Sequence, residues 1–117
     1  MDYKDLEVWK AAMDLVVEIY KITEKFPKSE KYNLSGQMRD AGVSIPSNIA
    51  EGSSRESYKD YHRFVLISSG SCRELETQAL IAKRIGYDMP NDIFKRIERQ
   101  KKLINGTKRY LKTKIRK

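Results

Sequence analysis

The sequence contains very few residues of the types that hold metals or form cross-links, with one cysteine and one histidine among 117 residues. Because Cys72 has no cysteine partner, an internal disulfide is excluded, which fits a reducing compartment. A zinc site needs several Cys or His ligands, more than Cys72 and His62 supply. The Glu-x-x-His pairs of di-iron bundles are missing too, since Lys59 stands three residues before His62. We therefore expect no metal and no cofactor.

Long apolar runs and the motifs of common enzyme classes are also missing. No unbroken apolar run exceeds four residues, whereas a membrane-spanning helix needs about 20. The opening residues MDYKDLEVWK have no apolar stretch typical of a signal peptide. Neither the G-x-x-x-x-G-K-S/T motif of a P-loop nor a supported Ser/His/Asp arrangement occurs. These absences predict a cytoplasmic protein that contacts no membrane and is not an enzyme.

Positive charge, by contrast, is abundant and concentrated at one end of the chain. The formal net charge is +8. Residues 90–117 include eleven Lys and Arg but two acids, Asp92 and Glu98, so that this segment carries +9. The remaining 89 residues carry −1. A basic block on one element is typical of proteins that bind a polyanion.

Apolar residues recur at spacings of three and four along four segments, which predicts helices and no strand. In the first segment these residues are Trp9, Ala12, Met13, Val16, Ile19 and Tyr20, and in the last they are Ile93, Ile97, Ile104 and Leu111. The predicted helices cover about 6–26, 29–51, 57–85 and 90–117. Short connections make neighbouring helices antiparallel. Length and pattern predict one all-α domain, residues 1–117, folded as an antiparallel up-down-up-down four-helix bundle.

Residues at the ends of these segments set the predicted helix boundaries. Asp5 and Ser29 are the expected N-caps of the first and second helices, and Ser57 begins a sequence resembling a capping box for the third. Gly86 supplies a C-cap for the third helix. Pro90 suits the first turn of the fourth helix, where its missing N–H costs nothing.

The stretch VSIPSNIAEG, residues 43–52, places a proline inside the second predicted helix. Pro46 pushes its ring toward the carbonyl of residue 42, a glycine that does not resist a bend, so we expect a kink near Pro46. A break followed by a short helix is the alternative. Asn48 and Glu51 point roughly the same way, and Glu51 near a helix C-terminus needs a basic partner. We interpret them as a structural polar cluster, with a ligand or catalytic role as the competing interpretation.

Two features of the third predicted helix concern its surface. Five small residues, Ser68–Cys72, lower helix propensity and allow another helix to approach closely, so we interpret them as packing residues. A reactive Cys72 thiol is the alternative, with Arg73 alone beside it to lower its pKa. The preceding residues Phe64–Ile67 cover almost a full turn with apolar side chains, more than one core buries. A second apolar surface predicts contact with another subunit, and hence a homo-oligomer.

Several of these stretches together point to one family. The matching residues are Asp5–Trp9, Phe26-Pro27, Glu30, Tyr32, Leu34, Gln37–Arg39, Ser44–Gly52, the region of Phe64, Gly70-Ser71, Glu74–Thr77 and Ile85–Tyr87. On these residues the sequence resembles the bacterial four-helix-bundle proteins of the 23S rRNA intervening-sequence family, also called the S23 ribosomal protein family, over about residues 2–90. That family is similar to the accessory protein of diversity-generating retroelements, a ring-shaped pentamer that binds nucleic acid and a reverse transcriptase. The resemblance implies an oligomeric, nucleic-acid-associated bundle, with a pentamer as the suggested assembly.

The basic last quarter has a physical reason to contact phosphates, because each neutralised phosphate releases counterions. Tyr110 lies among Lys108, Arg109 and Lys112 and is able to stack on a base. No base-reading motif accompanies them, so we expect non-specific binding of RNA or DNA. The alternatives are a solvated basic face, or a scaffold or accessory subunit that binds an acidic protein such as a reverse transcriptase. The residues predicted to bind nucleic acid are Lys95, Arg96, Arg99, Lys102, Lys108, Arg109, Tyr110 and Lys112.

Overall fold

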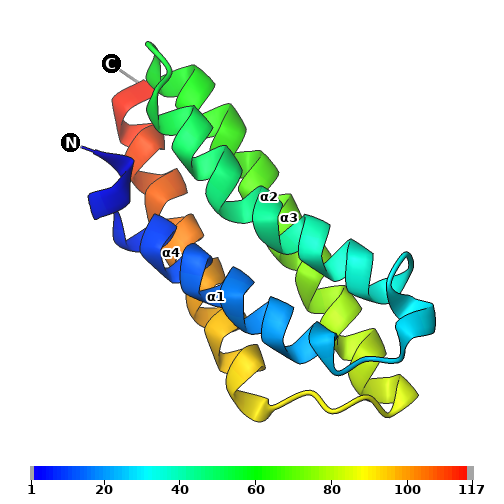
Figure 1. Ribbon diagram of the computed structural model, residues 1–117. Helices are drawn as coiled ribbons and strands as arrows, with labels where there is room; N and C mark the ends of the chain where they lie inside the picture. The colour runs from blue at the N-terminus through cyan, green and yellow to red at the C-terminus, as the bar shows by residue number, and fades with distance from the viewer. Residues whose placement is uncertain (1, 116–117) are drawn as a thin grey trace.

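The computed structural model describes residues 2–115, which form four long helices and no strand. The prediction of an all-α four-helix bundle is confirmed for these residues. Successive helices run in alternating directions (Figure 1), and the Cα atoms extend over 50 × 22 × 21 Å. In chain order the elements are η1 (Tyr3–Asp5), α1 (Glu7–Glu24), η2 (Lys28–Glu30), α2 (Leu34–Ser53), α3 (Tyr58–Ile85) and α4 (Asn91–Ile115), where η marks a short 3₁₀ turn.

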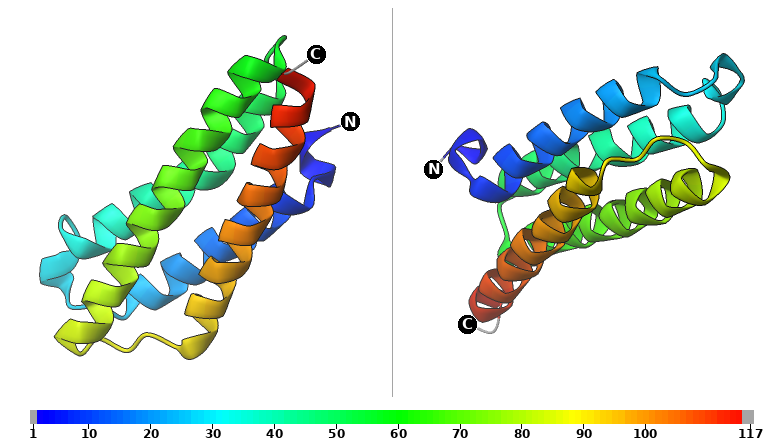
Figure 2. Two further views of the ribbon diagram at one scale, coloured as in Figure 1. Left: turned by 180° about the vertical axis from the view of Figure 1, so that it is seen from behind. Right: turned by 90° about the horizontal axis from the view of Figure 1, so that it is seen from below.

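Each long helix packs on the next one along the chain, and α4 closes the bundle by packing on α1. Helices α1 and α3 therefore lie diagonally across the core, as do α2 and α4, and the two views of Figure 2 show this order. The most extensive packing joins α2 to α3, and η1 packs on α1 and α2. The start of α1, the connection between α2 and α3, and the C-terminal end of α4 consequently meet at one end of the bundle (Figures 1 and 2).

The core is one apolar cluster to which all four helices contribute. The stripe predicted for the last helix is right: Ile93, Ile97, Ile104 and Leu111 are at most 1% exposed. The face predicted for the first helix is partly wrong, because Met13 and Tyr20 are 40% and 43% exposed while Leu15 is buried between Ala12 and Ile19. Apolar residues cover two adjacent faces of α1, so their spacing alone does not indicate which face the core buries.

Two predicted helix starts are wrong. Asp5 belongs to η1, and α1 begins after Leu6, which has no side-chain cap. The second long helix begins at Leu34, whereas Ser29 lies in η2. The intervening Asn33 has a non-helical backbone (φ −116°, ψ −110°), and its side-chain amide donates to the Ser29 carbonyl at 3.3 Å. A side chain that bonds the local backbone in this way competes with helix formation.

Three other predicted boundary residues are confirmed, whereas the predicted end of the last helix at residue 117 lies outside the described residues. The Ser57 hydroxyl accepts the backbone N–H of Asp60 at 3.1 Å, as an N-cap does. Gly86 ends α3 with a left-handed backbone (φ 105°), which a glycine adopts without strain. Pro90 immediately precedes α4, and its carbonyl accepts the N–H of Ile93 at 3.0 Å.

Helix α2 continues through Pro46 without interruption, so the alternative of a break at this proline is wrong. Gly42, four residues earlier, is buried against α1, and a Cβ added there would lie 3.7 Å from Val16 Cγ2. On the other side, the Ser68 hydroxyl of α3 donates to the Ile45 carbonyl at 2.9 Å. Helices α1 and α3 therefore both contact α2 just before the proline, and the kink itself stays a prediction.

Candidate nucleic-acid interface

The first half of α4 carries cations that carboxylates already neutralise. The ion pairs are Arg96–Asp92 (2.8 Å), Arg99–Glu7 (2.6 Å), Lys101–Glu76 (3.2 Å) and Lys101–Glu98 (3.3 Å). The hydrogen bond from Arg99 lowers the pKa of Glu7, because it favours the charged carboxylate. Two of the residues predicted to bind phosphate, Arg96 and Arg99, therefore already have acidic partners.

The second half of α4 differs, because no acid follows Glu98 in the sequence. Five cations from the middle of α4 onward have no carboxylate of residues 2–115 within the 4.0 Å that defines an ion pair. We call these five the C-terminal cation patch: Lys102, Lys108, Arg109, Lys112 and Lys114. Lys95 is also exposed and free of such a partner, but it lies near the opposite end of α4.

The positive potential of the patch reaches α3 at His62. The pKa of His62 is lowered, first by burial and then by the positive charges of Lys112 and Lys108. Its Nε2 atom is buried and has no hydrogen-bond partner among residues 2–115. His62 is therefore neutral near pH 7, and its titration is sensitive to any anion that binds beside these two lysines.

A groove of about 920 Å³ lies beside the patch, at the end of the bundle where α4 passes the start of α1 and residues 54–57. Its apolar and aromatic lining consists of Leu6, Val8, Leu103, Tyr58, Tyr61 and Tyr110. Lys102 of the patch also lines it. The buried Gln100 side chain donates to the Val8 carbonyl at 3.0 Å and so fixes α4 against the first turn of α1 at this point.

Three tyrosines from two helices converge in the groove. Tyr58 and Tyr110 are 49% and 54% exposed, whereas Tyr61 is half-buried. Burial raises the pKa of Tyr61, and interaction with the Tyr110 phenol raises it further. Tyr110 was among the predicted residues, but Tyr58 and Tyr61 were not. Their three-residue spacing at the start of a helix is the signal that places both on one face.

The glycine that ends the VSIPSNIAEG stretch positions Tyr61. A Cβ on Gly52 would lie 2.8 Å from Phe64 Cβ and 2.9 Å from Tyr61 Cδ1, closer than atoms pack. Gly52 therefore allows the first turns of α3 to pack directly on the end of α2, which brings Tyr61 into the groove.

Asn48 and Glu51, predicted as one polar cluster, take part in separate sets of contacts. The Asn48 amide donates to the Ser44 carbonyl at 2.8 Å, and the Ser44 hydroxyl is 2.7 Å from that of Ser71 on α3. Glu51 is exposed and pairs with Arg55, the basic partner that a carboxylate near a helix end needs.

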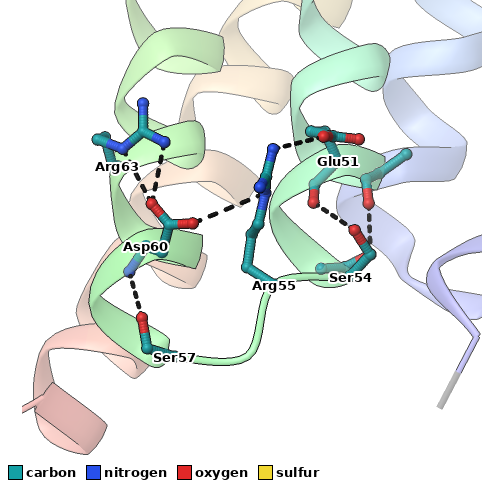
Figure 3. A network of polar contacts seen from close by, with 8 residues as sticks. Glu51, Ser54, Arg55, Ser57, Asp60 and Arg63 are labelled. Atoms are coloured by element: carbon teal, nitrogen blue, oxygen red, sulfur yellow. Dashed lines mark hydrogen bonds and ion pairs between the residues drawn. The ribbon is translucent and has the colours of Figure 1, made fainter.

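Arg55 connects the end of α2 to the start of α3 (Figure 3). Its guanidinium contacts Glu51 and lies 3.6 Å from Asp60, which accepts a second ion pair from Arg63 at 2.9 Å. Ser54 and Ser57 complete this connection, the first by donating to the Glu51 carbonyl at 2.8 Å and the second as the cap of α3. These contacts give the loop that borders the groove a defined shape.

Cys72 is fully buried, and burial raises the pKa of its thiol to about 11, with the nearby Glu76 as the next cause. The thiol is therefore protonated and inaccessible near pH 7. The packing interpretation holds for Ser68, Ser71 and Cys72, which are buried, but not for Gly70, which is exposed and has no atom within 4 Å of an added Cβ.

Residues 2–115 contain neither a candidate membrane-spanning helix nor a candidate metal-binding cluster. No helix among them combines the length and the apolar character that crossing a membrane requires. They also contain no group of three or more His, Cys, Asp or Glu side chains that could hold a metal ion.

Comparison with known proteins bears on α1, α2, α3 and most of α4. The family model described as 23S rRNA-intervening sequence protein matches residues 4–107. The matched range includes the groove residues of α1 and the α2–α3 connection, as well as Lys102, whereas four of the five patch cations lie beyond it. No curated protein matches the sequence. Because the match covers most of the chain, the chain belongs to the 23S rRNA-intervening sequence protein family.

Proposed function

We propose that this chain is a non-enzymatic protein that binds RNA or DNA, and that the C-terminal half of α4 contacts the phosphate backbone. The observation that supports this function best is the C-terminal cation patch. Its five side chains follow one another along one half-helix with no carboxylate of residues 2–115 in ion-pair distance. Cations without an internal partner gain most from contact with an external anion.

The spacing of the patch makes its charges act together. An α-helix rises about 1.5 Å per residue, so Lys108 and Lys112 are separated by about 6 Å along the axis. This separation is shorter than the Debye length of about 8 Å at physiological ionic strength, so their potentials add. A flexible chain of phosphates meets several of these charges at once, and its affinity comes from the counterions that it releases.

The ion pairs divide the predicted phosphate-binding residues into groups. Lys102, Lys108, Arg109 and Lys112 are available without any rearrangement. Arg96 and Arg99 must first leave their carboxylates, or contact phosphate while they remain paired. We therefore assign the main phosphate contacts to the patch, and we treat Arg96, Arg99 and the distant Lys95 as secondary.

The proposal is tested by measuring the fluorescence anisotropy of a labelled generic RNA during titration with the protein at several salt concentrations. The logarithm of the affinity is expected to fall linearly with the logarithm of the salt concentration, because counterion release drives the binding. Binding that does not respond to salt, or no binding at low salt, would refute the proposal.

We also propose that the protein assembles with itself. Helix α3 exposes large apolar side chains that the core of one bundle does not cover, between 42% and 55% each: Leu66, Ile67, Leu80, Ile81 and Ile85. Covering such a surface with a second subunit removes apolar area from water. Five subunits is the number that the family resemblance suggests. Light scattering is expected to give a multiple of the 13.7 kDa chain mass, reduced by Ile67→Glu combined with Ile81→Glu.

A protein partner is the second candidate function, and the mixed apolar and cationic character of the groove region favours it. An acidic protein, such as a nucleic-acid enzyme, would use the same cations. Affinity capture before and after nuclease treatment separates the two functions, because a protein partner survives the nuclease and a nucleic-acid bridge does not. A bacterial, cytoplasmic setting belongs to the same proposal and is supported by the family assignment and the single cysteine.

A further inference from the structure

We propose that the groove beside the patch receives an unpaired base of a single-stranded nucleic acid, with Tyr58 and Tyr110 as its stacking surfaces. This inference rests on the proposed function, because it assigns a place to the bases of a strand whose phosphates contact the patch. It adds a preference for single strands over duplexes, which a cation patch alone does not produce.

The aromatic rings of the groove are unusually available. Tyr58 and Tyr110 come from different helices, and about half of each side chain is exposed within one groove. Among residues 2–115 the Tyr87 hydroxyl donates a hydrogen bond, to Glu30, whereas none of the three groove tyrosines donates one. The hydroxyls in the groove are therefore free to contact a ligand. The Tyr110 ring is contacted by Lys114, whose Nζ lies 5.5 Å from the ring centroid, so a base stacks on the face that this patch cation leaves open. Stacking of a base on an aromatic side chain strengthens binding by about one to two orders of magnitude and tolerates any base.

The charges around the groove place a base inside it and a phosphate outside it. Two carboxylates line the groove, Glu7, which Arg99 engages, and Glu56, which has no ion-pair partner among residues 2–115. Arg55 lines it too, but its charge is already paired with Glu51 and Asp60. These carboxylates disfavour a phosphate in the groove but not a neutral base. Lys102 at the groove wall and the patch beyond it provide the cations for the flanking phosphates.

The dimensions of the groove also suit a base. Ligand pockets commonly measure about 300–1,000 Å³, and this groove falls within that range. Gly106 helps to keep it open, because a Cβ built on this residue has the Arg109 guanidinium at 3.9 Å as its nearest neighbour. A larger side chain at residue 106 therefore has room to enter the groove without disturbing the core.

A preference for single strands distinguishes this inference from phosphate contact alone. A duplex holds its bases in pairs, so none of them enters a groove unless a pair first opens. A duplex also carries the higher charge density, so counterion release by itself favours duplex binding. Tighter binding of a single strand than of the matching duplex is consequently the result expected from base stacking.

The experiment compares a single strand, as RNA and as DNA, with a duplex of the same sequence, for the wild type and a set of single variants. Tyr58→Ala and Tyr110→Ala are each expected to weaken single-strand binding about 10-fold and to leave duplex binding within about twofold. Tyr58→Phe and Tyr110→Phe keep the stacking ring and are expected to bind like the wild type. Gly106→Leu fills the groove without changing charge and is expected to behave like the Ala variants.

Tyr32→Ala is the matched control, because Tyr32 is 87% exposed and does not line the groove. A single strand containing 2-aminopurine adds a direct readout, since its fluorescence is quenched when the base stacks on a tyrosine. Salt-dependent binding without single-strand preference, unchanged by the Ala and Leu variants, would overturn this inference and leave the proposed function standing. Failure of every nucleic acid to bind at low salt would overturn both.

Discussion

A comparison of two double substitutions in α4 tests whether the patch, rather than the total charge, binds nucleic acid. Lys108→Ala/Lys112→Ala removes two cations that have no carboxylate partner among the described residues. Arg96→Ala/Arg99→Ala removes two cations that are already paired. Both changes remove the same charge from the same helix. An effect of total charge would weaken binding equally, whereas an effect of the patch would not.

The magnitude follows from the number of unpaired cations. For a single strand, the logarithm of the affinity falls with the logarithm of salt by about 0.7 for each neutralised phosphate. Contact with all five patch cations gives a slope of about −3.5, and removal of two makes the slope shallower, about −2.1. Relative to about 1 M salt, where this contribution vanishes, the lost contacts correspond to about 25-fold weaker binding at about 0.1 M. The paired variant is expected to keep the steeper slope.

The assay is fluorescence anisotropy with one labelled strand over a series of salt concentrations, with thermal melting by circular dichroism to verify that both variants fold. The sole histidine gives an independent check by NMR. Removal of Lys108 and Lys112 is expected to raise the pKa of His62, because both lysines lower it in the wild type. Equal slopes for the two double variants, or a larger loss from the paired one, would refute the assignment of phosphate contacts to the patch.

Three further predictions concern stability and reactivity. Gly52→Ala is expected to lower the free energy of unfolding by about 1–3 kcal/mol in urea titrations, because its Cβ would overlap α3. The Cβ of Gly70→Ala would meet no atom within 4 Å, so this control is expected to raise the free energy of unfolding by about 0.5–1 kcal/mol. Equal effects of the two substitutions would contradict the packing argument. Cys72 is expected to react with a thiol reagent only on unfolding, since its pKa is about 11 and its side chain is buried; rapid reaction of the native protein would contradict this. Folding lowers the pKa of His62, so the unfolded chain takes up a proton before the folded one as pH falls below about 6.5, and the protein loses stability in that range. The melting temperature of His62→Gln is expected to fall less over the same pH range. An unchanged pH dependence of the melting temperature would contradict this reasoning.

The bundle was predictable from the sequence because its strongest patterns are local. The apolar residues of α4 form one narrow stripe between charged faces, so a single orientation of this helix buries them. Helix α1 has apolar residues on two faces, and the choice between them depends on where α2 and α4 pack. The start of α2 was mispredicted for a related reason, because Asn33 bonds the local backbone in competition with the helix that Ser29 was expected to begin.

The candidate site was predictable in its charge but not in its arrangement. The basic block is visible in the sequence, and so is the Arg96–Asp92 pair, which is separated by one helical turn. The Arg99–Glu7 pair joins residues 92 positions apart, and the fold alone brings them together. The same is true of the groove, whose tyrosines approach one another only because the start of α3 and the end of α4 lie at the same end of the bundle.

The packing of α4 distinguishes the C-terminal cation patch from a disordered charged tail. Ile104 and Leu111 are buried in the core, so the residues between and around them are held on an ordered helix. A disordered tail with the same lysines would show a similar salt dependence, but it would lose conformational freedom on binding and would have no groove beside it. Truncating the chain before Leu111 would remove core packing together with the cations. Point substitutions at the patch and at Gly106 therefore separate charge, order and groove shape, which a deletion would change together.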